Sequence, residues 1–208
     1  FAAARVHPLF RALWQPRLIA ALERFEQWIA ENAAQGEVLL ASEVSGEMRV
    51  DGVQVLGRAD RIDRLPDGSL RIIDYKTGRV PSKPEVEAGY ALQLGLLGLI
   101  AQAGGFAKEG VPAAPATAFE YWSFGKDDEG FGKRVSPMKV GKARTGLEPD
   151  KFLPHHAAKL SEAIRRYIKG REPFTARANP DYKGYTDYDQ LMRLEEWIVR
   201  LHDTEQGA

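Results

Sequence analysis

Cysteine is absent from the 208-residue sequence. Its absence excludes structural disulfides, a thiol nucleophile, cysteine-ligated zinc and iron–sulfur clusters, and it makes the cytoplasm the default location. Long apolar runs are missing too, since the apolar stretch at residues 92–103 is interrupted by Gly95, Gly98 and Gln102. We therefore expect neither a membrane span nor a signal peptide.

An excess of charge of either sign is also lacking, because 29 Lys and Arg residues balance 29 Asp and Glu residues. This balance excludes a histone-like basic binder and an acidic disordered chain, so attraction to a polyanion has to be local. The length and apolar content suit one domain, expected over residues 1–208. Because the chain begins at Phe1 without an initiator methionine, we expect a fragment of a larger protein whose N-terminal part is missing.

The first half of the chain has clear periodic patterns. Apolar side chains at helical spacing predict an amphipathic helix over residues 16–32. Three β-rich runs separated by turn signals follow, and they predict an antiparallel meander with strands at residues 38–50, 53–62 and 70–73.

The second half predicts helix, strand and loop in turn. Helical periodicity returns over residues 84–102 and is followed by an aromatic and β-branched strand at 116–124, which suggests an α/β crossover. Residues 125–150 are rich in glycine, lysine and proline and are expected to be a loop. Two further helices are expected at 152–169 and 187–202. The fold class is therefore α/β, with a mixed sheet flanked by helices.

Charged side chains cluster where two adjacent strands end. A short hairpin can place Asp60 and Asp74 side by side, and the period of two puts Lys76 on the same face as Asp74. Magnesium takes one or two carboxylates with water and phosphate oxygens, and the backbone carbonyl of Tyr75 is a candidate third ligand. Mn²⁺ is an expected substitute. Lys76 would orient or deprotonate the attacking water while the metal polarises a phosphate.

An Asp-x-Lys at a strand end is also common as a surface ion pair. The second aspartate, Asp60, and Gln93 on the next helix favour a nuclease-type site. Gln93 has an alternative role as a satisfied core amide.

These residues resemble the PD-(D/E)xK nuclease superfamily, and within it the RecB-like branch with its GxxD, DYK and QxxxY motifs. The matching positions are residues 57–60, 74–76 and Gln93, and the segment 188–197 is similar to the C-terminal nuclease domain of the AddB family. The resemblance implies a restriction-endonuclease-like α/β fold and Mg²⁺-dependent, exonuclease-type hydrolysis of DNA. It also implies that Gln93 lies near the metal-bound water or the DNA backbone. It further implies double-strand break repair and recombination, single-stranded DNA ends as substrate, and an AddA-like helicase-nuclease partner.

The sequence departs from this family at several positions. Leu97 occupies the place of the motif's tyrosine, the cysteines that hold an iron–sulfur cluster in AddB relatives are absent, and His7 lies outside the helical motif that supplies a histidine ligand in RecB-like nucleases. A non-catalytic DNA-binding or scaffold domain of the same complex therefore remains the alternative. His155 and His156 have no partners at zinc-ligand spacing, and we expect solvated caps at a helix start.

Basic residues near the site and in the loop region are candidates for DNA backbone contacts, with a solvated surface as the alternative. These candidates are Arg58, Lys133, Arg134, Lys139 and Lys142. Nearby aromatic residues could stack bases of a single strand, although aromatics at strand spacing are more often core residues. This group comprises Trp122, Phe124 and Phe131.

Two other acidic residues invite weaker interpretations. We expect Asp63 to be structural, in an ion pair with Arg61 or Arg64 at the strand end. Glu43 is either an acid that faces the site and orients a metal ligand, or an edge-strand side chain that faces solvent.

Overall fold

The computed structural model describes residues 8–127, 130–141 and 143–173. The chain forms two compact units, residues 1–162 and residues 163–208. The described part of the second unit contains the π-helix Ile164–Ile168 and an ion pair of 2.6 Å between Arg166 and Glu172. His7, Lys142, the expected helix at 187–202 and the AddB-like segment lie outside the described residues.

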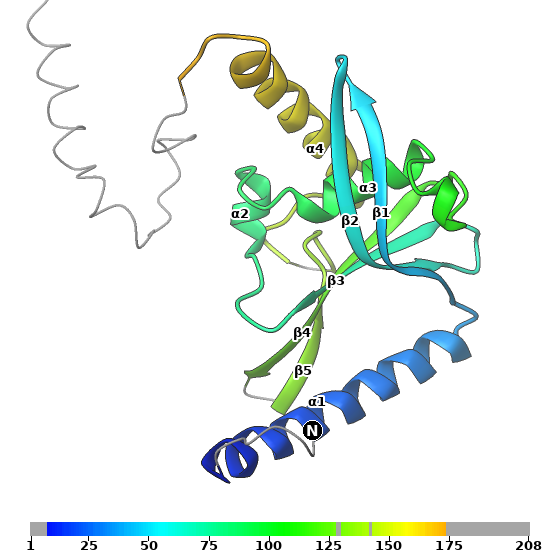
Figure 1. Cartoon of the computed structure of the whole chain (residues 1–208), viewed down its shortest axis with the longest axis vertical. Helices are drawn as coiled ribbons and strands as arrows, with labels where there is room; N and C mark the ends of the chain where they lie inside the picture. The colour runs from blue at the N-terminus through cyan, green and yellow to red at the C-terminus, as the bar shows by residue number, and fades with distance from the viewer. Residues whose placement is uncertain (1–7, 128–129, 142, 174–208) are drawn as a thin grey trace, which may run out of the picture. The chain divides into compact units, whose positions relative to one another are not determined.

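Within the described residues, five strands form one sheet in the order β1-β2-β3-β4-β5 (Figure 1). Neighbouring strands are antiparallel except for β3 and β4, which are parallel. The expected α/β fold with a mixed sheet flanked by helices is thus confirmed. The elements of the first unit are α1 (Pro8–Ala34), β1 (Val38–Val50), β2 (Val53–Arg64), β3 (Leu70–Lys76), α2 (Lys83–Glu87), α3 (Gln93–Gln102), η1 (Ala107–Glu109), β4 (Ala116–Asp127), β5 (Gly130–Val135) and α4 (Pro149–Ala163).

The first helix and the meander of β1, β2 and β3 are confirmed, but two of the strands are longer than predicted. β2 continues to Arg64 and β3 to Lys76. The charged end of β3 remains a strand because it pairs with β4 as far as Lys76 opposite Ser123. Long-range pairing therefore overrides the weak strand preference of the charged residues.

The second half differs from its prediction in two places. The helix expected over 84–102 is two helices, α2 and α3, because Gly89 adopts a left-handed φ of 86° that interrupts the helical backbone. The segment expected to be a loop contains the edge strand β5, which pairs with β4. α4 begins at Pro149, and the π-helix follows directly after Ala163.

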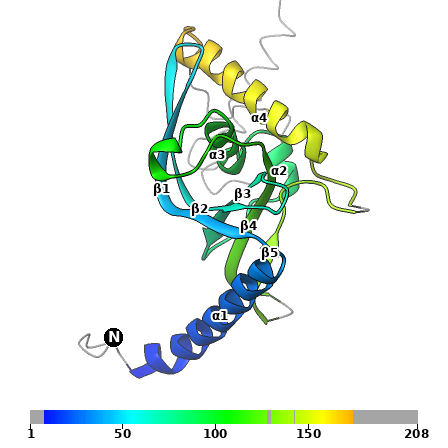
Figure 2. The same ribbon diagram turned by 90° about the vertical axis from the view of Figure 1, so that its right-hand side faces the viewer.

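Apolar clusters lie on both faces of the sheet, which α1 and α3 cover from opposite sides (Figure 2). The larger cluster packs beneath α3 and includes Ile72 and Phe119. The smaller cluster joins Trp28 of α1 to Ile73 and Trp122. The apolar stripe of α1 is buried only in its C-terminal half, since the large side chains of its N-terminal half are about half exposed. No described helix is both long and apolar enough to cross a bilayer.

Candidate active site

The site lies where β2 and β3 end their pairing. The antiparallel register runs from Arg64 opposite Leu70 to Arg61 opposite Ile73, so Asp60 and Asp74 are the next two residues of the same register. The backbone N–H of Tyr75 donates to Asp60 Oδ2 at 2.8 Å. This hydrogen bond fixes the Asp60 carboxylate against the tip of β3.

Lys76 connects the end of β3 to α3. Its Nζ lies 2.8 Å from Asp74 Oδ2 and donates to Gln93 Oε1 at 3.2 Å. The same ammonium lies over the ring of Tyr121 on β4, at 5.8 Å from the ring centroid. Gln93 is the first residue of α3, so the packing of α3 on the sheet determines where this amide meets the lysine.

The Asp74 carboxyl group is buried, with 2% of the residue exposed. Burial raises the pKa of Asp74 most strongly; Lys76 lowers it, the negative charge of Asp60 raises it, and Gln93 lowers it, with a net rise. Within the described residues, Asp74 Oδ2 is buried without a well-aligned hydrogen-bond donor, although the Lys76 ammonium lies within ion-pair distance. A cation beside this oxygen would relieve the cost of burying its charge.

The donor set fits a hard divalent cation. Asp60 and Asp74 supply carboxylate oxygens, and the Tyr75 carbonyl belongs to the peptide between Tyr75 and Lys76 at the same strand tip. No group of three or more His, Cys, Asp or Glu side chains suited to a metal occurs among the residues with described positions. Two carboxylates suffice for Mg²⁺, which retains several of its waters, whereas a closed zinc site needs four protein ligands.

Tyr121 was not anticipated from the sequence. It stands opposite Asp74 in the parallel register of β3 and β4, and it is almost fully buried. Burial, followed by the charges of Asp74 and Glu85, raises the pKa of the Tyr121 hydroxyl, so this side chain lies within the electrostatic reach of the site. Its aromatic strand was recognised, but the register that brings it beside Asp74 depends on the crossover through α3.

The two weaker acidic candidates have separate partners. Asp63 accepts two hydrogen bonds from Arg61 Nε, at 2.8 and 2.9 Å, and the predicted structural ion pair is confirmed. Glu43 pairs with Arg58 at 2.8 Å, and their side chains are 58% and 65% exposed. Glu43 therefore faces solvent, which was the second of its two interpretations.

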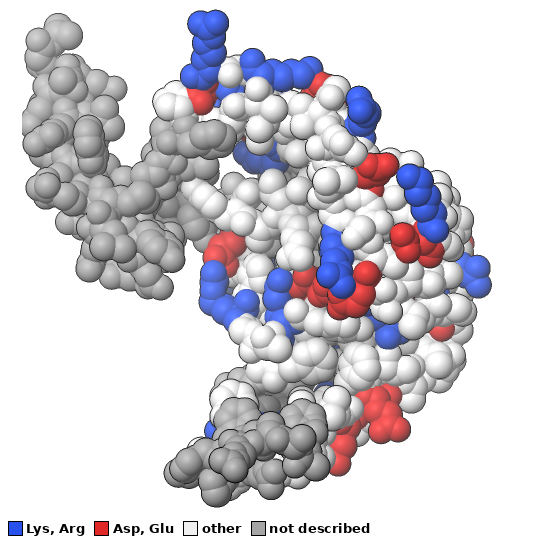
Figure 3. Space-filling view, in the orientation of Figure 1, with Lys and Arg blue, Asp and Glu red and all other residues white. Residues whose placement is uncertain are grey.

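The described candidates for DNA contacts come from separate elements. Arg58 lies on β2, Lys133 and Arg134 on β5, and Lys139 in the following loop, where it pairs with Glu148 at 2.6 Å. Lys142 lies outside the described residues. Over the β1–β2 hairpin, basic and acidic side chains lie next to one another (Figure 3).

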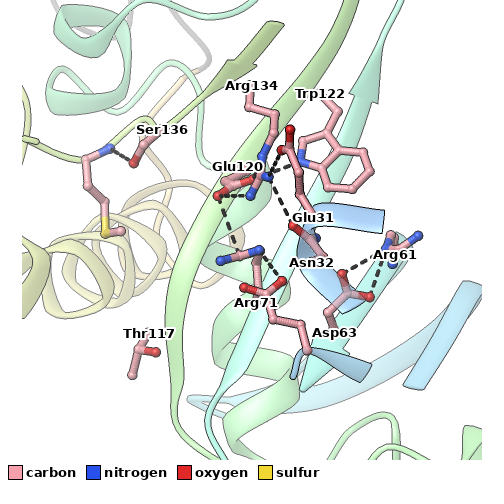
Figure 4. A network of polar contacts seen from close by, with 12 residues as sticks. Glu31, Asn32, Arg61, Asp63, Arg71, Thr117, Glu120, Trp122, Arg134 and Ser136 are labelled. Carbon is pink, nitrogen blue, oxygen red and sulfur yellow. Dashed lines mark hydrogen bonds and ion pairs between the residues drawn. The ribbon is translucent and has the colours of Figure 1, made fainter. Parts of the chain in front are cut away.

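Arg134 belongs to a polar network on the α1 side of the sheet (Figure 4). It donates to Glu120 at 2.9 and 3.1 Å and to Asn32 Oδ1 at 3.0 Å. Its guanidinium lies 5.4 Å from the ring centroid of Trp122. Burial would raise the pKa of Glu120, but hydrogen bonds from Arg134 and Trp122 hold that pKa below its usual value.

Two aromatic candidates for base stacking are packed inside the smaller cluster. Trp122 is fully buried, and Phe124 packs against Trp28 at 6.1 Å between ring centroids. Both are therefore core residues, which was the alternative to base stacking. The side chain of Phe131 lies outside the described residues.

The prediction of solvated histidine caps is wrong for His156. This residue is fully buried, and its Nδ1 lies 2.7 Å from the Phe152 carbonyl oxygen. The ring fits against Gly95 of α3, where a Cβ atom would come within 2.2 Å of it. A glycine on one helix thus makes room for a histidine on another, which spacing along the sequence does not reveal.

Leu97 occupies a core position. It is 3% exposed, and its Cδ2 would lie 2.8 Å from a Cβ placed on Gly57. The glycine that begins the GxxD motif therefore allows α3 to approach β2 closely, and Leu97 fills the contact.

The chain is similar in part to two curated proteins and to one solved structure. Uncharacterized protein RC0550 of Rickettsia conorii is 32% identical over 99 residues, and uncharacterized protein RT0391 of Rickettsia typhi is 32% identical over 88 residues. These matches cover 46% and 40% of the chain but only 12% and 10% of those proteins, so the matched segments are about a tenth of each relative's length. The crystal structure of SSO0001 aligns with a TM-score of 0.31 and 14% identity, covering 73% of this chain and 68% of that one.

A family model supplies the assignment. The model described as "PD-(D/E)XK nuclease superfamily" matches residues 2–188, which is most of the sequence. The mixed five-stranded sheet with flanking helices is consistent with the restriction-endonuclease-like fold expected above. The chain therefore belongs to the PD-(D/E)XK nuclease superfamily.

Proposed function

We propose that this chain is a divalent-metal-dependent deoxyribonuclease that hydrolyses phosphodiester bonds of DNA. The observation that carries the proposal is the buried Asp74 carboxylate, which lies beside the charge of Asp60 and in an ion pair with Lys76. A purely structural surface pair would not need a carboxylate whose pKa is raised by burial, because such perturbed groups concentrate at functional sites.

Each residue has a role in this proposal. Asp60, Asp74 and the Tyr75 carbonyl hold Mg²⁺, or Mn²⁺ in its place. The bound ion supplies Lewis-acid polarisation of the scissile phosphate. Lys76 orients the attacking water and stabilises the charge that develops on the phosphate oxygens, while Gln93 holds the lysine amine in place. Water adds its oxygen to phosphorus, one phosphorus–oxygen ester bond breaks, and the departing oxygen is protonated.

The biological setting is proposed from the motifs. The GxxD, DYK and glutamine pattern supports the RecB-like branch, and the ending resembles AddB. The chain would then process single-stranded ends during double-strand break repair in the cytoplasm, as one nuclease domain of a longer protein acting with an AddA-like helicase-nuclease partner. Arg58, Lys133, Arg134, Lys139 and Lys142 stay candidates for contacts with the DNA backbone.

The direct test compares Asp74→Asn with Asp67→Asn, which removes the same charge in the turn before β3, at the opposite end of that strand from the site. End-labelled single-stranded DNA is incubated with each protein in Mg²⁺ or Mn²⁺. Asp74→Asn should reduce the cleavage rate on the order of 100-fold or more, and Asp67→Asn should cleave like the wild type. Equal cleavage by Asp74→Asn and the wild type would reject the assigned site.

A non-catalytic DNA-binding or scaffold domain is the second candidate. It is favoured by the burial of Leu97 at the motif's tyrosine position. Calorimetric titration with Mn²⁺ separates the two functions. A nuclease should bind the ion in a way that depends on Asp60 and Asp74, whereas a scaffold should bind DNA without such metal binding.

A further inference from the structure

The ammonium group of Lys76 has three contacts at the site, each from a different element. Its Nζ lies 2.8 Å from Asp74 Oδ2 of β3, donates to Gln93 Oε1 of α3 at 3.2 Å, and lies 5.8 Å from the ring centroid of Tyr121 on β4. The first contact is an ion pair, whereas the other two join the ammonium to neutral groups. The three contacts therefore respond differently when a second cation enters the site.

The ion pair with Asp74 conflicts with the proposed metal site. Asp74 Oδ2 pairs with the lysine, and the same oxygen is the buried one that a cation beside it would stabilise. A divalent ion at this oxygen would compete with the ammonium for the carboxylate and would repel the ammonium, because like charges a few ångströms apart are unfavourable. Lys76 then needs contacts other than Asp74 if it is to stay beside the attacking water.

Tyr121 offers the ammonium a fixed and neutral surface. It stands opposite Asp74 in the parallel register of β3 and β4, and its other neighbour across the sheet is Val135 of β5. The residue is 1% exposed and belongs to the apolar cluster beneath α3. The face of an aromatic ring attracts a cation within about 6 Å of its centroid but supplies no oxygen ligand to a hard divalent ion. The ring and the carboxylates therefore attract different cations.

The lysine and the ring lie on the same face of the sheet. Lys76 is four residues beyond Ile72 on β3, and Ile72 belongs to the cluster beneath α3 together with Tyr121. The Lys76 side chain is 26% exposed, and its flexible four-carbon stem has other rotamers open to it. A buried ring beside the ammonium favours the rotamer that stays at the site.

We propose that the Tyr121 ring, together with the Gln93 amide, holds the Lys76 ammonium at the site while a divalent ion occupies Asp74. Tyr121 is thus a positioning residue for hydrolysis, since it acts through Lys76. Without metal the lysine also pairs with Asp74, and the contacts with Tyr121 and Gln93 are the two that do not depend on that carboxylate. The inference rests on the proposed function, because it concerns the lysine that orients the attacking water.

A role of Tyr121 in packing alone predicts a different pattern among variants. Tyr121→Leu keeps an apolar side chain in the cluster but removes the aromatic face, whereas Tyr121→Phe keeps the face and removes only the hydroxyl. Phe119→Leu is the matched control, because Phe119 lies two residues earlier on β4, is 2% exposed in the same cluster and packs on α3 at Gly98. If Tyr121 only filled the core, Tyr121→Leu and Phe119→Leu would have similar effects.

The first measurement follows the Lys76 side chain by NMR in the whole chain, with its signals identified by their loss in Lys76→Arg. The ring current of Tyr121 should shift the methylene protons next to the ammonium upfield. The wild type should keep this shift when Mg²⁺ is added to saturation. Tyr121→Phe should show the shift as well, and Tyr121→Leu should lose it.

The second measurement is the single-turnover rate of cleavage of end-labelled single-stranded DNA in Mg²⁺. Tyr121→Leu should cut about tenfold more slowly than the wild type, which is the size of effect expected from a partly buried cation–π contact. Tyr121→Phe should regain most of that loss, because phenylalanine restores the aromatic face. Phe119→Leu should cut at close to the wild-type rate.

The outcomes separate the role of Tyr121 from the proposed function. Loss of the upfield shift in the wild type on addition of Mg²⁺ overturns the inference, and that result does not depend on the folding of any variant. Equal slowing in Tyr121→Leu and Phe119→Leu also overturns it, and so does a Tyr121→Phe protein as slow as Tyr121→Leu. The proposed function survives each of these results, whereas a wild type without Asp74-dependent Mn²⁺ binding overturns the proposed function and the inference with it.

Discussion

The exchange Gly57→Ala tests whether a close approach of α3 to β2 holds the site together. A Cβ atom at position 57 would lie 2.8 Å from Leu97 Cδ2 and 2.9 Å from Ile100 Cδ1. Both methyl groups belong to buried side chains, so they cannot swing into solvent. Either these side chains leave their favoured rotamers or α3 moves away from the strand.

The expected loss of stability follows from this overlap. Forcing an extra methyl group into a packed core costs about 1–3 kcal/mol. For a chain of this size, that lowers the melting temperature by roughly 2–12 °C. Cleavage activity should fall as well, because α3 begins with Gln93, whose side chain accepts a hydrogen bond from Lys76.

The assay is thermal unfolding at fixed protein concentration, with Gly78→Ala as control. No atom outside the neighbouring residues lies within 4 Å of a Cβ at Gly78, so the free energy of unfolding of that variant should stay within about 0.5 kcal/mol of the wild-type value. The double variant Gly57→Ala with Leu97→Ala should be less destabilised than the sum of the single variants, by about 0.5–3 kcal/mol. If Gly57→Ala melts like Gly78→Ala and shows no coupling to Leu97→Ala, the packing argument is refuted.

Three further exchanges probe charge and packing. Asp74→Asn should raise the melting temperature of the metal-free chain at pH 7, because burial raises the pKa of Asp74. Protonated Asp74 carries no buried charge, so its contribution to stability is fully present below the unfolded pKa of 3.8 and is lost as pH rises through the folded pKa. The difference in melting temperature between Asp74→Asn and the wild type should therefore shrink towards acid pH. A difference that grows there would contradict this reasoning. Glu85→Ala should cost about 1 kcal/mol in urea unfolding at pH 7, since it removes the capping box with Ser82. Arg79 lowers the pKa of Glu85 to about 2, so this cost should shrink as pH falls from 4.5 towards 2, and a constant cost would exclude the charged pair as a contributor. Ile73→Ala, at a fully buried position between the aromatic rings, should cost about 2–5 kcal/mol in the same assay.

The first three strands could be predicted from the sequence because alternating side chains and turn residues mark them within a few positions. The turn at Asp51 and Gly52, where both residues have positive φ, was readable from the residue types alone. β5 was missed because its sequence, Gly130–Val135, has the glycine and lysine content of a loop. It is a strand because β4 supplies hydrogen-bond partners, and that pairing determines its conformation more than composition does.

The same distinction applies to the site. Asp60, Asp74 and Lys76 could be grouped from the sequence because a hairpin and the two-residue period are short-range constraints. Tyr121 could not be added, since its place beside Asp74 depends on the parallel register of β3 and β4 across the α3 crossover. The burial of His156 likewise depends on contact between α4 and α3, which no local pattern records.

Packing and chemistry meet within one turn of α3. Gln93 and Leu97 are four residues apart, so they lie on the same side of the helix. Gln93 accepts a hydrogen bond from Lys76, whereas Leu97 is buried against Gly57, three residues before Asp60. The first turn of α3 therefore carries the polar contact with Lys76, and the second turn carries the apolar contact with Gly57. Gly57 allows α3 to pack closely on β2, and Gln93 at the start of the same helix contacts Lys76.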